Sequence, residues 1–136
     1  MYLFDTNVVS ELRKGGRANS GVAAFFATLA PEDIYLSVLT IGEIRRGLEN
    51  VRGRGDEEQA GRLERWLDVM VSDYADRILD FDIECAQVWG KLMAPSSQHP
   101  IDKQIAATAL IYDLAVVTRN VEDFKPTGIR ILNPFN

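Results

Sequence analysis

The strongest constraint on the fold of this chain is a repeated alternation between short apolar runs and longer amphipathic segments. Strand-like apolar runs occur at residues 1–4, 34–39, 77–81, 115–119 and 129–132. Apolar residues at three- and four-residue spacing predict helices between them, at about 6–14, 20–30, 40–51, 57–74, 83–94 and 101–114. Strands that alternate with helices connect by right-handed crossovers. We therefore expect an α/β fold with a mostly parallel sheet of about five strands and helices on both faces.

Length and composition are those of one globular domain, so residues 1–136 are expected to form a single unit. No apolar run approaches the roughly 20 residues that cross a bilayer, and the first residues carry no signal peptide. The lone Cys85 cannot form an internal disulfide, and its helical pattern with Val88, Trp89 and Leu92 indicates core packing. These features predict a cytoplasmic protein.

Four acids stand near the predicted sheet edge. Asp5 follows the first strand, Glu43 lies in the helix after the second, Asp102 opens the helix before the fourth, and Asp123 follows the fourth. In a parallel sheet the carboxyl ends of the strands and the starts of the following helices share one edge. We therefore expect these four carboxylates to meet in one cleft.

Each acid also has a purely structural explanation. Asp5 or Thr6 could cap the first helix, and Thr40 to Glu43 fits a capping box. Asp102 sits in a first helical turn, where the helix dipole favours a carboxylate. Asp123 alone would be an ordinary loop acid.

The four acids together predict a metal site, because carboxylates in one cleft repel each other unless a cation lies between them. A set of oxygen ligands points to Mg²⁺ or Mn²⁺ rather than zinc. Such an ion can activate water for attack on a phosphodiester. The net charge of −5 excludes a broadly basic nucleic-acid binder but not an enzyme that works through metal.

Two further features are weaker indications of functional residues. His99, the only histidine, could be a general acid or base, but a histidine in a loop is more simply explained as an exposed residue. Four arginines lie within ten positions, and either a solvated helix end or a binding patch explains them equally well: Arg45, Arg46, Arg52 and Arg54.

Three sequence blocks together resemble the PIN-domain family, specifically VapC/FitB-type toxin ribonucleases of bacterial toxin–antitoxin pairs. They are "LFDTNVVSEL" (3–12), "LSVLTIGEIRRGL" (36–48) and "PIDKQIAATALIYDLAVVTRNVEDF" (100–124). Their order and spacing match over nearly the whole chain. The resemblance implies a PIN-like three-layer α/β/α sandwich and a Mg²⁺- or Mn²⁺-dependent endonuclease that acts on RNA.

The resemblance also implies residue roles. The family's catalytic acids map onto Asp5, Glu43, Asp102 and Asp123. Asp5 and Asp102 would hold the metal, and Glu43 would bind it through water or orient the attacking water. Asp123 would complete the shell, directly or through water, or support a second metal. The accessory polar positions map onto Thr6, Asn7, Thr118 and Asn120. Asn120 stands where many relatives have Asp, so either Asp123 or Asn120 completes the site.

The expected partners follow from the same resemblance. Members of the family usually form homodimers and hetero-oligomers with a small DNA-binding antitoxin, which threads a segment across the cleft. Arg45 and Arg46 would contact RNA or this antitoxin. The apolar face of the 57–74 helix is expected to be mainly core, with Trp66 and Met70 reaching a dimer contact.

Two alternatives compete with a toxin ribonuclease. One is a non-catalytic PIN-like module that binds RNA or antitoxin. The other is a haloacid-dehalogenase-like phosphatase, which also places an acid after its first strand. The phosphatase needs a second Asp two residues further on as general acid, and Asn7 occupies that position.

Overall fold

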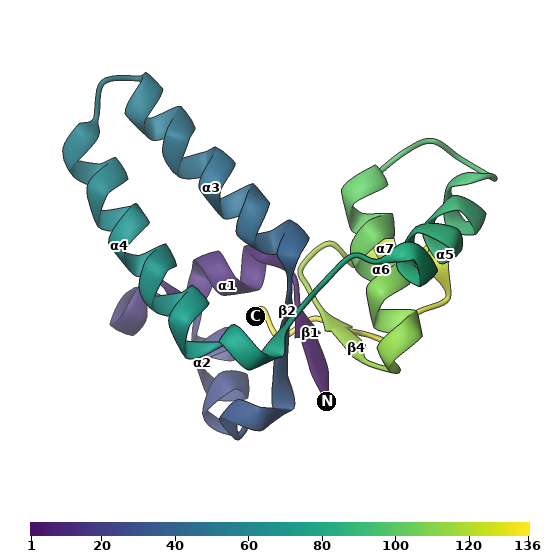
Figure 1. Cartoon of the computed structure of the whole chain (residues 1–136). Coiled ribbons are helices and arrows are strands. Elements are labelled where there is room, and N and C mark those ends of the chain that lie inside the picture. Colours follow the sequence, from purple (N-terminus) through teal and green to yellow (C-terminus); the bar gives the residue numbers. More distant parts are fainter.

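The computed structural model describes all 136 residues and has the predicted α/β architecture (Figure 1). Five strands form the sheet: β1 Tyr2–Phe4, β2 Ile34–Ser37, β3 Ile78–Leu79, β4 Ala115–Val117 and β5 Ile131–Leu132. Seven helices surround it: α1 Thr6–Leu12, α2 Ser20–Ala27, α3 Val38–Gly53, α4 Glu57–Asp73, α5 Ile83–Met93, α6 Pro100–Tyr112 and α7 Val121–Phe124. Every predicted helix and strand is therefore present.

The sheet has the strand order β3-β2-β1-β4-β5, and all neighbouring strands are parallel. The first strand lies in the centre, where Leu3 pairs with Tyr35 on one side and with Val116 on the other. The predicted parallel sheet is confirmed. The end of β1 is thus the central point of the carboxyl edge, where ligands bind in open α/β sheets.

Two hydrophobic cores cover the two faces of the sheet, because successive strand residues point to opposite sides. Phe4 and Val117 pack on one face with residues of α1, α2, α3 and α4. Leu3 and Val116 pack on the other face with residues of α6 and with Phe124 of α7. Figure 1 shows these two groups of helices on either side of the strands. The expected three-layer sandwich is confirmed.

The strands are shorter than predicted, most of all β3, which has two of the five residues expected at 77–81. The end of β2 also differs from the prediction. The expected strand 34–39 ends at Ser37, and α3 begins at Val38 instead of residue 40. Ser37 is the reason, because its hydroxyl Oγ accepts a hydrogen bond of 3.0 Å from the Leu39 amide and caps the helix. The capping box that would have explained Thr40 and Glu43 structurally is therefore not formed.

The antiparallel pair α3–α4 extends away from the sheet (Figure 1). Its turn contains Gly55 at φ +91°, a conformation that favours glycine. Arg52 ion-pairs with Glu49, Glu57 and Glu64, so it joins the two helices. Its role here is structural, as the interpretation of this arginine cluster as a solvated helix end allows.

Cys85 is fully buried in α5 and receives a weak hydrogen bond of 3.8 Å from the Thr108 hydroxyl of α6. The expectation that it packs in the interior is confirmed. None of the helices combines the length and the apolar composition needed to span a membrane.

Candidate active site

Asp5 lies at the carboxyl end of β1 and is also the N-cap of α1. Its backbone is extended, and its Oδ1 accepts a hydrogen bond of 2.8 Å from the Thr6 amide. Only 3% of the residue is exposed. The helix cap and the predicted site residue are thus one and the same side chain.

The second oxygen of Asp5 is held from β4. The Thr118 hydroxyl, directly after that strand, donates a hydrogen bond of 2.7 Å to Asp5 Oδ2, and Asn7 Nδ2 donates one of 3.2 Å. Burial is the main cause that raises the pKa of Asp5, and these hydrogen bonds oppose it. A buried carboxylate with fixed oxygens is suited to hold a cation.

Glu43 reaches the same cluster through Thr6. The Thr6 hydroxyl donates a hydrogen bond of 2.5 Å to Glu43 Oε1 and contacts the buried Thr40 hydroxyl at 3.2 Å. Glu43 does not cap α3, since that helix begins five residues earlier. Thr6 thus links the two carboxylates, since its amide donates to Asp5 Oδ1, and the negative charge of Glu43 raises the pKa of Asp5 further.

Asp102 lies in the first turn of α6, as predicted. Partial burial, followed by the charges of Asp5 and Asp123, raises the pKa of its carboxyl to about 6. Glu43 contributes in the same direction. The charges of the other three predicted acids therefore all raise the pKa of Asp102.

Asp123 lies in the short helix α7, not in a loop, and it contacts a residue to which the sequence assigned no site role. His99 Nε2 lies 3.4 Å from Asp123 Oδ1. One ligand atom each of His99, Asp102 and Asp123 lies within 4.8 Å of the others. The position of His99 just before α6 was the one available signal, because the same helix carries Asp102.

Asn120 plays a different part from Asp123. Asn120 is exposed, and its backbone amide donates a hydrogen bond of 2.9 Å to Thr118 Oγ1. Its side chain makes no capping hydrogen bond to α7. Asn120 thus orients the threonine that binds Asp5. Asp123, in contrast, has a carboxylate oxygen within 4.8 Å of one of Asp102, so its position fits the residue that completes the site better than that of Asn120 does.

The two candidate contact arginines differ in their surroundings. Arg45 ion-pairs with Glu49 at 3.0 Å and with Glu64 at 2.5 Å, so its charge is largely neutralised within the protein. Arg46 is exposed. The geometry therefore favours Arg46 over Arg45 as a free cation for a partner.

The donor set in the cleft fits a hard divalent cation. It consists of four carboxylates, one of them almost fully buried, and no Lys or Arg side chain pairs with any of them. Mutual repulsion of this kind is relieved by a bound cation, and carboxylate oxygens are the ligands that Mg²⁺ and Mn²⁺ take. Asp5 and Asp102, the two with raised pKa, are the strongest candidates to hold it.

Comparison with known proteins identifies the family. Residues 2–128 match the family described as PIN domain. The chain belongs to the PIN-domain family. This membership excludes the phosphatase alternative.

The match to individual PIN-domain relatives extends over the full length. The chain is 32% identical to "Toxin FitB" of Neisseria gonorrhoeae, covering 100% of this chain and 99% of the relative. It is 33% identical to "VapC ribonuclease Y4jK" of Sinorhizobium fredii, covering 99% and 98%. The solved structure "Crystal Structure of FitAcB from Neisseria gonorrhoeae" has a TM-score of 0.80 at 33% identity and covers 98% of both chains. The VapC/FitB-type resemblance is thus confirmed.

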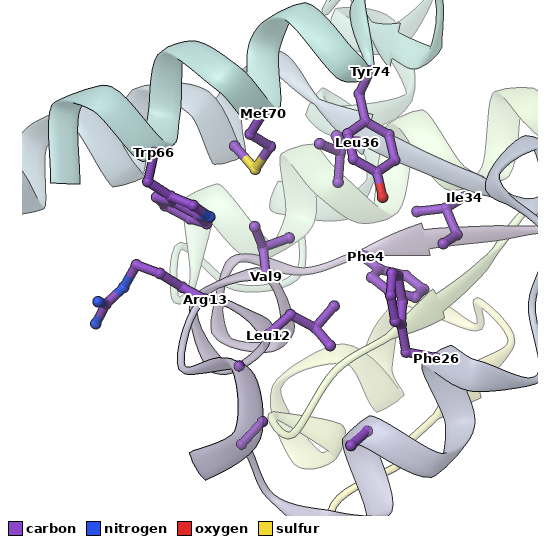
Figure 2. Close-up of a pocket in the computed structure, with 13 residues that line it drawn as sticks. Phe4, Val9, Leu12, Arg13, Phe26, Ile34, Leu36, Trp66, Met70 and Tyr74 are labelled. Atoms are coloured by element: carbon purple, nitrogen blue, oxygen red, sulfur yellow. The ribbon is translucent and has the colours of Figure 1, made fainter. Parts of the chain in front are cut away.

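An apolar pocket of about 330 Å³ lies on the α1–α2–α4 side of this PIN domain. Figure 2 shows Trp66, Met70 and Tyr74 of α4 above it, Val9 and Leu12 of α1 and Phe26 of α2 around it, and strand residues at its base. None of the four acids lines it. Trp66 and Met70, expected to reach a dimer contact, thus border a hollow that is separate from the acidic cleft.

Proposed function

We propose that this PIN domain is the toxin of a bacterial toxin–antitoxin pair and cleaves RNA as a Mg²⁺- or Mn²⁺-dependent endoribonuclease. The observation that carries the proposal is the clustering of the acids: Thr6 joins Asp5 to Glu43, and ligand atoms of Asp102 and Asp123 lie within 4.8 Å of each other. The full-length relatives named as a toxin and as a ribonuclease support it. A cluster of carboxylates suits metal-assisted hydrolysis of a phosphodiester.

Each acid has a distinct part in this mechanism. Asp5 and Asp102 would hold the ion, which when bound supplies charge stabilisation to the phosphate and an activated water. Thr118 and Asn7 keep Asp5 Oδ2 in place. Glu43, held by Thr6, would orient the attacking water and accept its proton.

The outer end of the cleft would complete the site. Asp123, near Asp102 and more exposed than Asp5, would complete the metal's surroundings, directly or through water. Arg46 would bind a phosphate of the RNA, because a guanidinium without an internal partner can donate two parallel hydrogen bonds to two phosphate oxygens.

The test is cleavage of RNA by purified protein with Mg²⁺, with Mn²⁺ and with a chelator, with the cut sites mapped. Asp5→Asn should abolish cleavage and leave the circular dichroism spectrum unchanged. Asp68→Asn on the exposed side of α4 is the matched control and should cleave like the wild type. Cleavage that survives in Asp5→Asn would reject the assignment. A wild type that binds RNA without cutting it would favour the non-catalytic module.

The proposed partners are RNA, a second copy of the chain and a cognate antitoxin. The apolar pocket beside α1, α2 and α4 offers room for apolar side chains of an antitoxin segment, and Arg13 at its border offers a charge for an acidic group. Co-purification with the small protein encoded next to this gene, followed by measurement of the mass of the complex, tests this part.

A further inference from the structure

We propose that His99 is a ligand of the metal ion in this cleft, together with Asp102 and Asp123, and that its ring nitrogen makes the site prefer Mn²⁺ to Mg²⁺. The proposal rests on the proposed function in one respect, since Asp102 is expected there to hold the ion. It adds a nitrogen ligand to a site otherwise built from oxygens.

The distances support a shared ion. Ligands of a divalent ion with bonds of about 2.1 Å lie about 3 Å apart at right angles and about 4.2 Å apart when opposite. His99 Nε2 and Asp123 Oδ1 are 3.4 Å apart, and the three ligand atoms lie within 4.8 Å of one another. Small side-chain rotations bring all three to one ion, and the half-exposed His99 side chain leaves an entry path.

The charges around His99, Asp102 and Asp123 also favour a bound cation. The only basic side chain within 4 Å of any of the four acids is His99 itself. The protein thus leaves an excess of negative charge at this end of the cleft, which a divalent ion between Asp102 and Asp123 would compensate.

The segment that carries His99 is held on both sides. Buried Lys103 donates a hydrogen bond of 2.6 Å from Nζ to the Ser96 carbonyl, and Trp89 Nε1 donates one of 3.1 Å to the Pro100 carbonyl. His99 itself has a left-handed backbone with φ +54°. The backbone on either side of His99 is thus held in place, so binding of the ion would have to order only the side chain.

The nitrogen donor determines the preference among metals. Mg²⁺ takes oxygen ligands almost exclusively, whereas imidazole is a good ligand for first-row transition ions. His99 should therefore strengthen the binding of Mn²⁺ and leave that of Mg²⁺ nearly unchanged.

The chain contains one histidine, so in the untagged protein any imidazole signal comes from His99. Electron spin-echo envelope modulation of Mn²⁺ bound to the RNA-free protein should show a directly coordinated ¹⁴N. Growth with ¹⁵N-histidine should replace it with a ¹⁵N coupling. A histidine that only pairs with Asp123 would give neither signal.

Affinity measurements complete the test. His99→Asn keeps a residue type that tolerates positive φ and removes the ring nitrogen. It should weaken Mn²⁺ binding by about tenfold or more and Mg²⁺ binding by less than about twofold. Gln98→Ala, at the neighbouring exposed position, is the matched control and should change neither.

The outcomes separate the two proposals. Bound Mn²⁺ without a nitrogen coupling, or equal losses of both ions in His99→Asn, would overturn the role of His99 and leave the metal-dependent ribonuclease standing. A wild type that binds neither ion would overturn both.

Discussion

Thr118 and Asp5, 113 residues apart in the chain, are joined by a buried hydrogen bond of 2.7 Å that links the ends of the two central strands. The same threonine oxygen accepts hydrogen bonds from the Asn120 amide and from Asn7 Nδ2. One hydroxyl therefore ties β1, β4 and the start of α7 to the carboxylate expected to hold metal. The accessory polar residues thus position Asp5.

Thr118→Val should show this directly, because valine has nearly the shape of threonine without its hydroxyl. We expect a loss of about 1–3 kcal/mol in the free energy of unfolding, since buried groups lose their partner. RNA cleavage should fall about 10–100-fold, as when a residue that orients a metal ligand is removed. Urea denaturation and initial cleavage rates measure the two effects. Thr28→Val, at an exposed threonine after α2, is the control; equal behaviour of both variants would contradict the prediction.

Asp102 should make the metal-free protein less stable as the pH rises. The pKa of its carboxyl is raised to about 6 in the folded protein, mainly by burial, and is about 4 in an unfolded chain. Between these values the folded state binds more protons than the unfolded state, so stability is lost as the pH increases. The side chain is partly exposed, and screening limits the effect to about 1 kcal/mol.

The measurement is urea denaturation at pH 4.5 and pH 7.5 in the presence of a chelator. Asp102→Asn should reduce the difference in unfolding free energy between the two pH values, while Asp68→Asn should leave it as in the wild type. A pH dependence that is identical in all three proteins would refute the coupling of Asp102 to the cluster.

Arg46 should contribute more to RNA binding than Arg45, because Arg45 already pairs with Glu49 and Glu64. We expect Arg46→Ala to weaken RNA binding and to reduce the slope of log affinity against log salt by about 1. Arg45→Ala should change the affinity less and lower stability by no more than about 1 kcal/mol. Binding titrations at several salt concentrations, in the background of Asp5→Asn, which is expected to be inactive, compare them. A larger loss with Arg45→Ala would reverse the assignment.

The apolar pocket should be needed by the antitoxin and not by the RNA. Ala23 of α2 lines it, so Ala23→Phe should fill part of the volume of about 330 Å³. We expect antitoxin binding to weaken by about tenfold or more, since tight interfaces depend on a few buried anchors. RNA cleavage by the free toxin should be unchanged. Calorimetry with the purified antitoxin and a cleavage assay provide the two readings, and unchanged antitoxin affinity would place the antitoxin elsewhere.

Asp5 and Asp102 could be placed from the sequence because their positions depend on short-range rules. An apolar run before Asp5 makes a buried strand, and Pro100 before Asp102 starts a helix. Glu43 could be placed in its helix from the spacing of the apolar residues around it, but the start of that helix could not, because both Ser37 and Thr40 are possible caps. The helix boundary depends on which of two hydroxyls reaches the backbone, and only packing decides that.

The place of His99 in the site, in contrast, could not be predicted from the sequence. Its neighbours in the sequence, Gln98 and Pro100, indicate an exposed loop, and the side chain is indeed half exposed. Its contact with Asp123 joins residues 24 positions apart, which no local pattern encodes.

The sequence by itself determined the alternation of strands and helices, the parallel sheet that follows from it, and the edge to which the acids are delivered. These depend on hydrophobic periodicity and on the geometry of crossovers, which act over a few residues at a time. The tertiary structure alone decided which polar groups touch: Thr118 with Asp5, Thr6 with Glu43, and His99 with Asp123. Such contacts depend on ångström-scale distances between strands and helices, and those distances are set by the packing of both cores on the sheet.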